Sequence, residues 1–233
     1  MSESPKSETS CEKLRAAALG AGVDLFGTAR IDEGQRSRFH DSIRDIARAL
    51  PYAVSMGIRL SSPVLETVLT APTWTYYYHY RQVNTALDQA ALFIAGEIQR
   101  EGYSALPVPA SQILDWDLLG AHLSHREIAG LAGLGWMGRN NLLVTPRFGS
   151  QVRLVTVLTD MELPARSGGH AGGDCGRCRA CVSMCPVGAI GEDPGDFNLD
   201  RCAAQLRRFT KSEKINAMIC GLCVKVCGGQ KDG

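Results

Sequence analysis

Four cysteines stand close together in the stretch CGRCRACVSMCP, namely Cys175, Cys178, Cys181 and Cys185. Two residues separate each of the first three, three residues precede the fourth, and Pro186 follows it. The pattern C-x2-C-x2-C-x3-C-P is typical of bacterial proteins that bind 4Fe-4S clusters: three thiolates bind corners of one cluster, and the fourth is directed to another. The spacing therefore predicts iron–sulfur chemistry, in which single electrons are stored and passed on.

A second set follows, consisting of Cys202, Cys220, Cys223 and Cys227. It repeats the arrangement, except that seventeen residues separate its first two members and Gly228 takes the place of the proline. In proteins with two such clusters, the fourth cysteine of each run binds the other cluster. The predicted ligands are Cys175, Cys178, Cys181 and Cys227 for the first cluster, and Cys202, Cys220, Cys223 and Cys185 for the second.

Structural zinc and disulfides are the alternative uses of these thiols. Zinc is satisfied by four thiolates, often in two C-x2-C pairs, and needs neither the third nearby cysteine nor the C-P step. Disulfides are rare in reducing compartments. Eight of the nine cysteines lie between positions 175 and 227, and Cys11 stands apart. The pattern favours two 4Fe-4S clusters over both alternatives.

The overall composition is that of an ordinary soluble globular protein, with 233 residues, 45% hydrophobic and 21% charged. Because 25 Lys and Arg nearly balance 24 Asp and Glu, net charge indicates neither nucleic acid nor an anionic membrane as a partner. The polar N-terminus has no secretory signal, and no run of eighteen apolar residues occurs. We expect a cytoplasmic protein without a membrane partner.

Helical and extended patterns alternate before the cysteine-rich region. They predict helices over 11–23, 35–50 and 80–101, and strands over 24–31, 52–60, 141–144 and 150–160. The expected fold class is an α/β (α+β) body with a C-terminal, bacterial ferredoxin-like double 4Fe-4S module. We place the body at 1–165, a glycine-rich flexible linker at 166–174, and the module at 175–233.

The stretch AGLAGLGWMGRNN, at 129–141, is unusually rich in glycine. Closely spaced glycines let a backbone approach a large planar or phosphate-bearing ligand, although a tight turn alone also uses them. Because the segment leads into a strand rather than a helix, it does not fit a nicotinamide site. The candidate cofactor contacts are Gly133, Gly135, Trp136, Gly138, Arg139 and Asn140.

A proton donor for reductive chemistry must hold a proton at working pH, and three side chains are candidates. The stretch WTYYYHYRQVN, at 74–84, is rich in aromatic residues that could pack in the core or line a ligand cavity. Its candidate donors are Tyr78 and Tyr80. Asp117, in ILDWDLL, is a third candidate, provided that burial keeps its carboxyl group protonated.

From about residue 115 to residue 227, the order of these motifs resembles the epoxyqueuosine reductase family. GLGWMGRN, a strand, CGRCRACVSMCP, the lone Cys202 and CGLCVKVC follow one another in that family, and more distantly in cobalamin-dependent reductive dehalogenases. The resemblance implies a base-off cobalamin held by the body near the glycine-rich loop. It also implies two clusters that pass electrons to this cobalamin from a low-potential donor such as ferredoxin or flavodoxin.

Two functions are compatible with this resemblance. In the first, the protein is an iron–sulfur oxidoreductase whose clusters feed a cobalamin for reductive chemistry on a small-molecule substrate. In the second, it is an electron-transfer or reductive-activator protein for another corrinoid or redox protein, without its own substrate. The body favours the first, because a two-cluster carrier needs only the cysteine-rich tail.

Three departures from the family pattern guide the expectations. Epoxyqueuosine reductases continue into a tRNA-contacting extension, whereas this chain stops at Gly233, so tRNA is not expected as a substrate. Counting back from the loop to the family's catalytic aspartate leads to Leu119, and Asp117 is two positions away. Arg139 stands where the family usually has lysine, which keeps the charge but changes its geometry.

Overall fold

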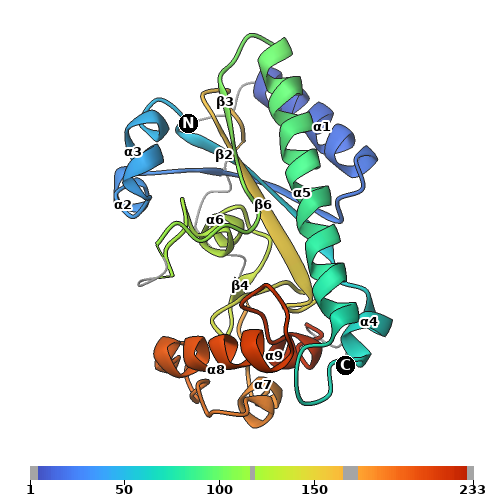
Figure 1. The fold of residues 1–233 in the computed structure, drawn as a ribbon. Coiled ribbons are helices and arrows are strands. Elements are labelled where there is room, and N and C mark those ends of the chain that lie inside the picture. The colour runs from blue at the N-terminus through green and yellow to red at the C-terminus, as the bar shows by residue number, and fades with distance from the viewer. Residues whose placement is uncertain (1–4, 116–118, 165–172, 230–233) are drawn as a thin grey trace. The chain divides into compact units, whose positions relative to one another are not determined.

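The computed structural model describes residues 5–115, 119–164 and 173–229 (Figure 1). The chain divides into two compact units. Unit 1 is Met1–Ile58, Asn84–Leu134 and Arg153–Ala171, and unit 2 is Arg59–Val83, Gly135–Val152 and Gly172–Gly233. Each unit is therefore assembled from stretches that are far apart in the sequence.

Unit 1 is built on a four-stranded sheet with the order β1-β2-β6-β3. The strands are β1 Leu25–Arg30, β2 Tyr52–Arg59, β6 Val152–Thr159 and β3 Ala105–Val108. β1 and β2 are antiparallel, with Leu25 opposite Gly57, and β3 and β6 are antiparallel, with Val108 opposite Thr156. The mixed α and β class predicted from the sequence is confirmed.

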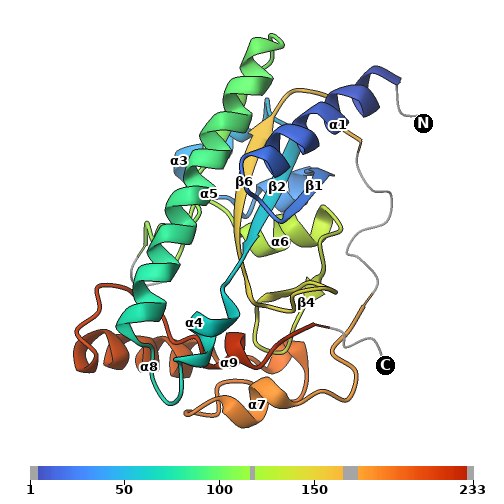
Figure 2. The ribbon, with the colours of Figure 1, turned by 90° about the vertical axis from the view of Figure 1, so that its right-hand side faces the viewer.

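Helices cover both faces of this sheet in unit 1 (Figures 1 and 2). The helices are α1 Pro5–Gly20, α2 Glu33–Arg36, α3 Asp41–Ala47, α6 His125–Leu131 and the part of α5 Trp74–Arg100 that follows Val83. On the face toward α2, α3 and α6, the core contains Ile31, Phe39, Ile43, Ile128 and Leu158. Burial of these apolar side chains supplies the main driving force for this unit.

The single helix predicted over 35–50 is in fact two helices, α2 and α3. The break lies at His40, whose backbone is extended and whose ring nitrogen Nδ1 accepts a hydrogen bond from the backbone N–H of Ser42 at 3.2 Å. The backbone N–H of His40 donates to the carbonyl of His122 at 2.9 Å. A new helix therefore starts where these contacts satisfy the free backbone groups.

Unit 2 consists of short elements (Figure 2). They are α4 Ser62–Glu66, the start of α5, the paired strands β4 Trp136–Met137 and β5 Leu143–Val144, α7 Ala180–Met184, the 3-10 helix η1 Pro194–Asp196, α8 Leu199–Ser212 and α9 Leu222–Lys225. The helix α9 packs on both α4 and α7. The cysteine-rich segment therefore shares its unit with the glycine-rich loop and with residues 59–83.

This division does not follow the predicted boundaries at 165 and 175, because residues 59–83 and 135–152 group with the tail. Most of the predicted linker, 166–174, lies outside the described residues, as does Asp117. Within the described parts of the chain, no helix combines the length and the apolar character that crossing a membrane requires.

Candidate functional site

Two tight backbone turns position cysteines of unit 2. Gly176 has a φ of +45°, and the backbone N–H of Cys178 donates to the carbonyl of Cys175 at 2.9 Å, which turns the chain sharply between these two cysteines. Gly221 has a φ of +87°, and a Cβ added there would lie 2.8 Å from the Tyr76 ring. Both turns need glycine, because other residues rarely adopt a positive φ.

The first set of thiols gathers around α7. Cys181 is 9% exposed. Burial raises the pKa of its thiol, and the charges of Cys227, Cys175 and Cys178 raise it further. Charges act in this way only between groups that lie near one another. The structure thus brings Cys227, from the end of the described chain, to the three closely spaced cysteines.

The second set gathers around α9. Burial raises the pKa of the Cys223 thiol, and the charges of Cys220, Cys202, Cys181 and Cys185 raise it further. Burial likewise raises the pKa of Cys220 to about 11, and the charges of Cys202 and Cys185 act in the same direction. Cys185 therefore lies near the second set, although it belongs to the first run in the sequence. Cys181 and Cys223 link the two sets.

The donor chemistry of these sulfur atoms suits iron–sulfur clusters. All cysteines are free, with no disulfide. The backbone N–H of Ala189 donates to Cys185 Sγ at 3.2 Å, and hydrogen bonds to sulfur tune the potentials of such clusters. In the described part of the chain, no three His, Cys, Asp or Glu side chains converge closely enough for a single metal ion. Thiolates that bind different corners of a cluster need no such convergence.

Arg139 and Asn140, predicted as cofactor contacts, bond to unit 2 itself. Arg139 is 7% exposed. Its guanidinium donates to the carbonyl oxygens of Glu192, Cys178 and Gly176, the last at 3.0 Å. Asn140 Nδ2 donates to Ser150 Oγ at 3.0 Å. Both side chains therefore connect the glycine-rich loop to other segments of the unit.

The glycines of this loop make close approaches to the chain itself. A Cβ at Gly135 would lie 2.1 Å from the carbonyl oxygen of Val144, and one at Gly138 would lie 2.5 Å from the Val144 side chain. Gly133 ends α6 with a φ of +74°, a common role of glycine after a helix. These contacts account for the three glycines without a ligand.

Trp136 is the loop residue that best fits an additional group. It is 5% exposed, and its Nε1 has no hydrogen-bond partner among the described residues. A Cβ at Gly173 would lie 2.4 Å from the indole ring, so that backbone passes directly against the ring. A buried N–H without an acceptor is uncommon, and an acceptor on a bound cofactor would satisfy it.

The two candidate tyrosines lie at the start of α5 in unit 2. Tyr78 is 51% exposed and stacks near the rings of Trp74 and Tyr77, at centroid distances of 5.7 and 5.3 Å. Tyr80 is half-buried. The third candidate, Asp117, lies outside the described residues. Tyr78 and Tyr80 therefore lie two residues apart on the same helix.

Lys225 is a residue of the site whose contacts the sequence did not predict. Its Nζ donates to the carbonyls of Val68, at 3.1 Å, and Glu66, at 3.3 Å, and pairs with the Glu66 carboxylate at 3.2 Å. Since Lys225 lies between Cys223 and Cys227, these contacts fix α9 to α4. Cysteine spacing carries no signal of this partnership, because residues 66 and 225 are distant in the chain.

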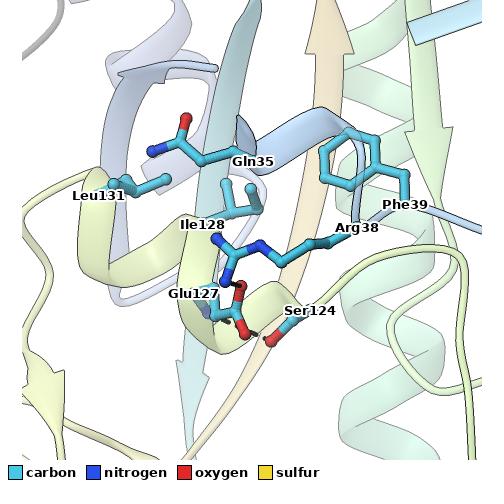
Figure 3. A pocket seen from close by; sticks show the side chains of 7 residues that line it. All are labelled: Gln35, Arg38, Phe39, Ser124, Glu127, Ile128 and Leu131. Atoms are coloured by element: carbon cyan, nitrogen blue, oxygen red, sulfur yellow. Dashed lines mark hydrogen bonds and ion pairs between the residues drawn. The ribbon is translucent and has the colours of Figure 1, made fainter. Parts of the chain in front are cut away.

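A separate small cavity lies in unit 1 (Figure 3). Its volume is about 70 Å³, and Arg38 and Glu127, which line it, form an ion pair with a separation of 3.3 Å. The remaining lining residues are Gln35, Phe39, Ser124, Ile128 and Leu131. Small-molecule sites usually measure about 300–1,000 Å³, so this cavity is too small for a cofactor.

Comparison with known proteins identifies the family. A model of the 4Fe-4S double cluster binding domain matches residues 174–229, which supports two 4Fe-4S clusters in this segment. An epoxyqueuosine reductase of Synechococcus sp. (strain RCC307) is 34% identical over 93% of this chain and 74% of its own length. The chain belongs to the epoxyqueuosine reductase family. The resemblance recognised from the sequence motifs is confirmed.

Other members of the epoxyqueuosine reductase family are matched over a smaller part of their length. The enzyme of Bacillus anthracis is 34% identical over 47% of this chain, and the match covers 30% of that protein. The chain thus spans about a third of the length of such relatives. These relatives are reductases.

Solved structures share the fold. An epoxyqueuosine reductase with an epoxyqueuosine-modified tRNA-Tyr stem loop matches with a TM-score of 0.60 and 21% identity, over 93% of this chain and 64% of that one. A reductive dehalogenase, whose structure suggests a mechanism for B12-dependent dehalogenation, matches with a TM-score of 0.73 and 19% identity, over 100% of this chain and 33% of that one.

The partners predicted from the sequence need correction. The prediction set tRNA aside in favour of a small-molecule substrate, because the chain stops at Gly233. Membership of the epoxyqueuosine reductase family, one of whose proteins is solved with a tRNA stem loop, contradicts it. The position of the last residue is a poor guide to a partner, since residues that contact a tRNA can lie anywhere along a chain.

Proposed function

We propose that the protein is a reductase with two 4Fe-4S clusters. The first would be bound by Cys175, Cys178, Cys181 and Cys227, and the second by Cys202, Cys220, Cys223 and Cys185. The observation that carries the proposal is the match of the 4Fe-4S double cluster binding domain to residues 174–229. The crossed assignment is supported by the pKa of Cys181, which the charge of Cys227 raises, and by the pKa of Cys223, which the charge of Cys185 raises. This crossed arrangement follows the ligand pattern of two-cluster ferredoxins.

Electrons would pass between the clusters one at a time. The charge of Cys181, in the first set, raises the pKa of Cys223, in the second set, which supports a short path between the clusters. The amide of Ala189, which donates to Cys185 Sγ, would stabilise the reduced second cluster, because hydrogen bonds to sulfur offset its negative charge.

Cobalamin is the proposed acceptor of these electrons. When bound, it would supply a low-valent cobalt centre that can reduce a substrate. Trp136 supports this assignment, because its buried Nε1–H lacks an acceptor among the described residues. The proposed contacts are Gly133, Gly135, Trp136, Gly138, Arg139 and Asn140, of which Arg139 and Asn140 act mainly by holding the loop in place.

The proposed substrate is the epoxide of an epoxyqueuosine nucleotide in tRNA, in keeping with the family. Reduction of an epoxide consumes protons as well as electrons. Tyr78, Tyr80 and Asp117 are the proposed donors. A tyrosine hydroxyl can act as a general acid, and Tyr78 is exposed enough for a large substrate to reach it.

The test is anaerobic purification with added hydroxocobalamin, followed by metal analysis and turnover of an epoxyqueuosine-modified tRNA stem loop. Retained iron and cobalt together with turnover support the whole proposal. Iron without cobalt would overturn the cobalamin assignment and favour an electron-transfer protein without its own substrate. Retained cobalt and iron without turnover would overturn the tRNA substrate alone.

A further inference from the structure

Arg139 is a buried cation that faces backbone oxygen atoms instead of a carboxylate. It is 7% exposed, and no Asp or Glu of the described chain pairs with it. Its Nε, Nη1 and Nη2 donate to the carbonyls of Glu192, Cys178 and Gly176. Removing an arginine from water is costly unless its donors are satisfied, so these three bonds explain how the charge is held there.

The three accepting carbonyls belong to two segments that flank α7 in the sequence. Gly176 and Cys178 lie within the tight turn that begins at Cys175. Glu192 lies beyond Cys185, where the chain returns after α7. One planar guanidinium therefore fixes both segments at once, a geometry that lysine does not reproduce.

We propose that Arg139 is a positioning residue for the first 4Fe-4S cluster and that its positive charge raises the reduction potential of this cluster. The inference rests on the proposed assignment of Cys175, Cys178, Cys181 and Cys227 as ligands. Reduction adds one electron to a cluster that is already anionic, and a buried cation nearby stabilises the added charge. The hydrogen bonds to the carbonyls keep the cation beside the cysteine turn, and electrostatic stabilisation of the reduced cluster increases as this distance shortens.

Arg179 provides a matched control from the same region. Its Nη1 also donates to the carbonyl of Gly176, at 3.1 Å, and its Nε pairs with the Glu192 carboxylate. The Arg179 side chain is 38% exposed, however, so water screens its charge. Removal of Arg179 should therefore change the cluster potential much less than removal of Arg139.

The experiment compares Arg139→Met, Arg139→Lys and Arg179→Met with the wild-type protein after anaerobic reconstitution. Iron and sulfide are counted, and the midpoint potential of each cluster is measured by redox titration followed by electron paramagnetic resonance. For Arg139→Met we expect the first cluster to become about tenfold harder to reduce, a shift of about 59 mV to more negative potential. The second cluster should keep its potential.

In Arg139→Lys the first cluster should have nearly the wild-type potential, since the positive charge remains. This variant should nevertheless lose iron to a chelator faster than the wild type, because lysine cannot make the three hydrogen bonds of the guanidinium. If Arg139→Met fails to assemble the cluster, Arg139→Gln, which keeps hydrogen-bond donors without the charge, replaces it with the same expected shift. Unchanged potentials in these neutral variants, or an equal shift in Arg179→Met, would overturn the inference. A wild-type protein without two 4Fe-4S clusters would instead overturn the proposed function.

Discussion

Unit 1 and the cysteine-rich segment of unit 2 are stabilised in different ways. Unit 1 packs Met56, Leu87, Ile94 and Leu158 with less than 2% exposure, whereas in residues 173–229 only Ile215 among the largest buried side chains is so enclosed. The cysteine-rich segment relies on polar contacts, such as those of Arg139 and Lys225. The difference teaches that an apolar core holds unit 1, and that the cysteine-rich segment would gain further stability from bonds between its thiolates and the proposed clusters.

Removal of iron tests this contrast with the largest expected effect. Because metal binding is coupled to folding in small metal-binding modules, chelation should lower the hydrogen-exchange protection of α8 by about 100-fold or more. The amides of β2 and β6 should keep their protection, since the apolar core of unit 1 does not depend on iron. Equal losses in both regions, or no loss in α8, would contradict the contrast.

Replacement of a crossed ligand should have the next largest effect. The reconstituted wild type is expected to hold about eight iron and eight sulfide per chain, that is, two clusters of four iron. Cys185→Ser should lower this to about four iron, with loss of the second cluster, because Cys185 lies near Cys202, Cys220 and Cys223. Iron analysis and electron paramagnetic resonance measure the result.

Cys11→Ser is the control for this variant. Cys11 lies in unit 1, on α1, away from both cysteine sets in the sequence. Its replacement should leave the iron content unchanged. Loss of iron in Cys11→Ser, or stoichiometric zinc without broad visible absorbance in the wild type, would show that the ligand assignment is wrong.

Two glycine variants, one in each unit, should change stability by an intermediate amount. In Gly135→Ala, the new Cβ would meet the Val144 carbonyl at 2.1 Å, and such overpacking costs about 1–3 kcal/mol. We expect earlier loss of cluster absorbance on titration with denaturant. In Gly96→Ala on α5, the nearest atom, on Arg100, is 3.7 Å away, and unit 1 should gain about 0.5–1 kcal/mol of helix stability.

One result for Gly135→Ala would contradict this expectation. If the variant loses cobalamin while its clusters keep the wild-type denaturation midpoint, the loop serves only the cofactor. Far-ultraviolet circular dichroism checks the Gly96→Ala variant, for which a lower midpoint would contradict the expectation.

The smallest of the expected effects is a change in the stability of unit 1 with pH. Burial lowers the pKa of His125 to about 4, and its ring nitrogens bond to Thr156 Oγ1 at 2.9 Å and the Pro109 carbonyl at 2.8 Å. Because the unfolded state takes up a proton near pH 6.5 and the folded state does not, stability falls as the pH drops from 6.5 to 4. The residue is half-buried, so we expect a loss of about 1 kcal/mol at most between pH 7 and pH 5.5.

His125→Gln should remove this pH dependence, because glutamine does not titrate. Hydrogen exchange of β3 and β6 amides at the two pH values measures the effect within unit 1. If stability changes with pH equally in the variant and in the wild type, another group is responsible.

The sequence by itself determined the fold class, the family and the double-cluster domain. Close thiol spacing encodes these features locally, because ligands two residues apart reach one cluster only through a particular turn. Apolar periodicity likewise predicted β1, β2, β6 and most of α5. It failed at His40, where capping contacts with Ser42 and His122 divide the predicted helix, since periodicity alone does not report such contacts.

Only the tertiary structure decided how distant segments share a unit. The grouping of residues 59–83 with the cysteines, the contact of Lys225 with Glu66, and the three carbonyls held by Arg139 all join positions far apart in the chain. The sequence placed Arg139 among the candidate cofactor contacts, because it stands beside glycines. That its donors bond to the carbonyls of Gly176, Cys178 and Glu192 is visible only in the folded chain, because a buried charge is held by whichever acceptors the fold places around it.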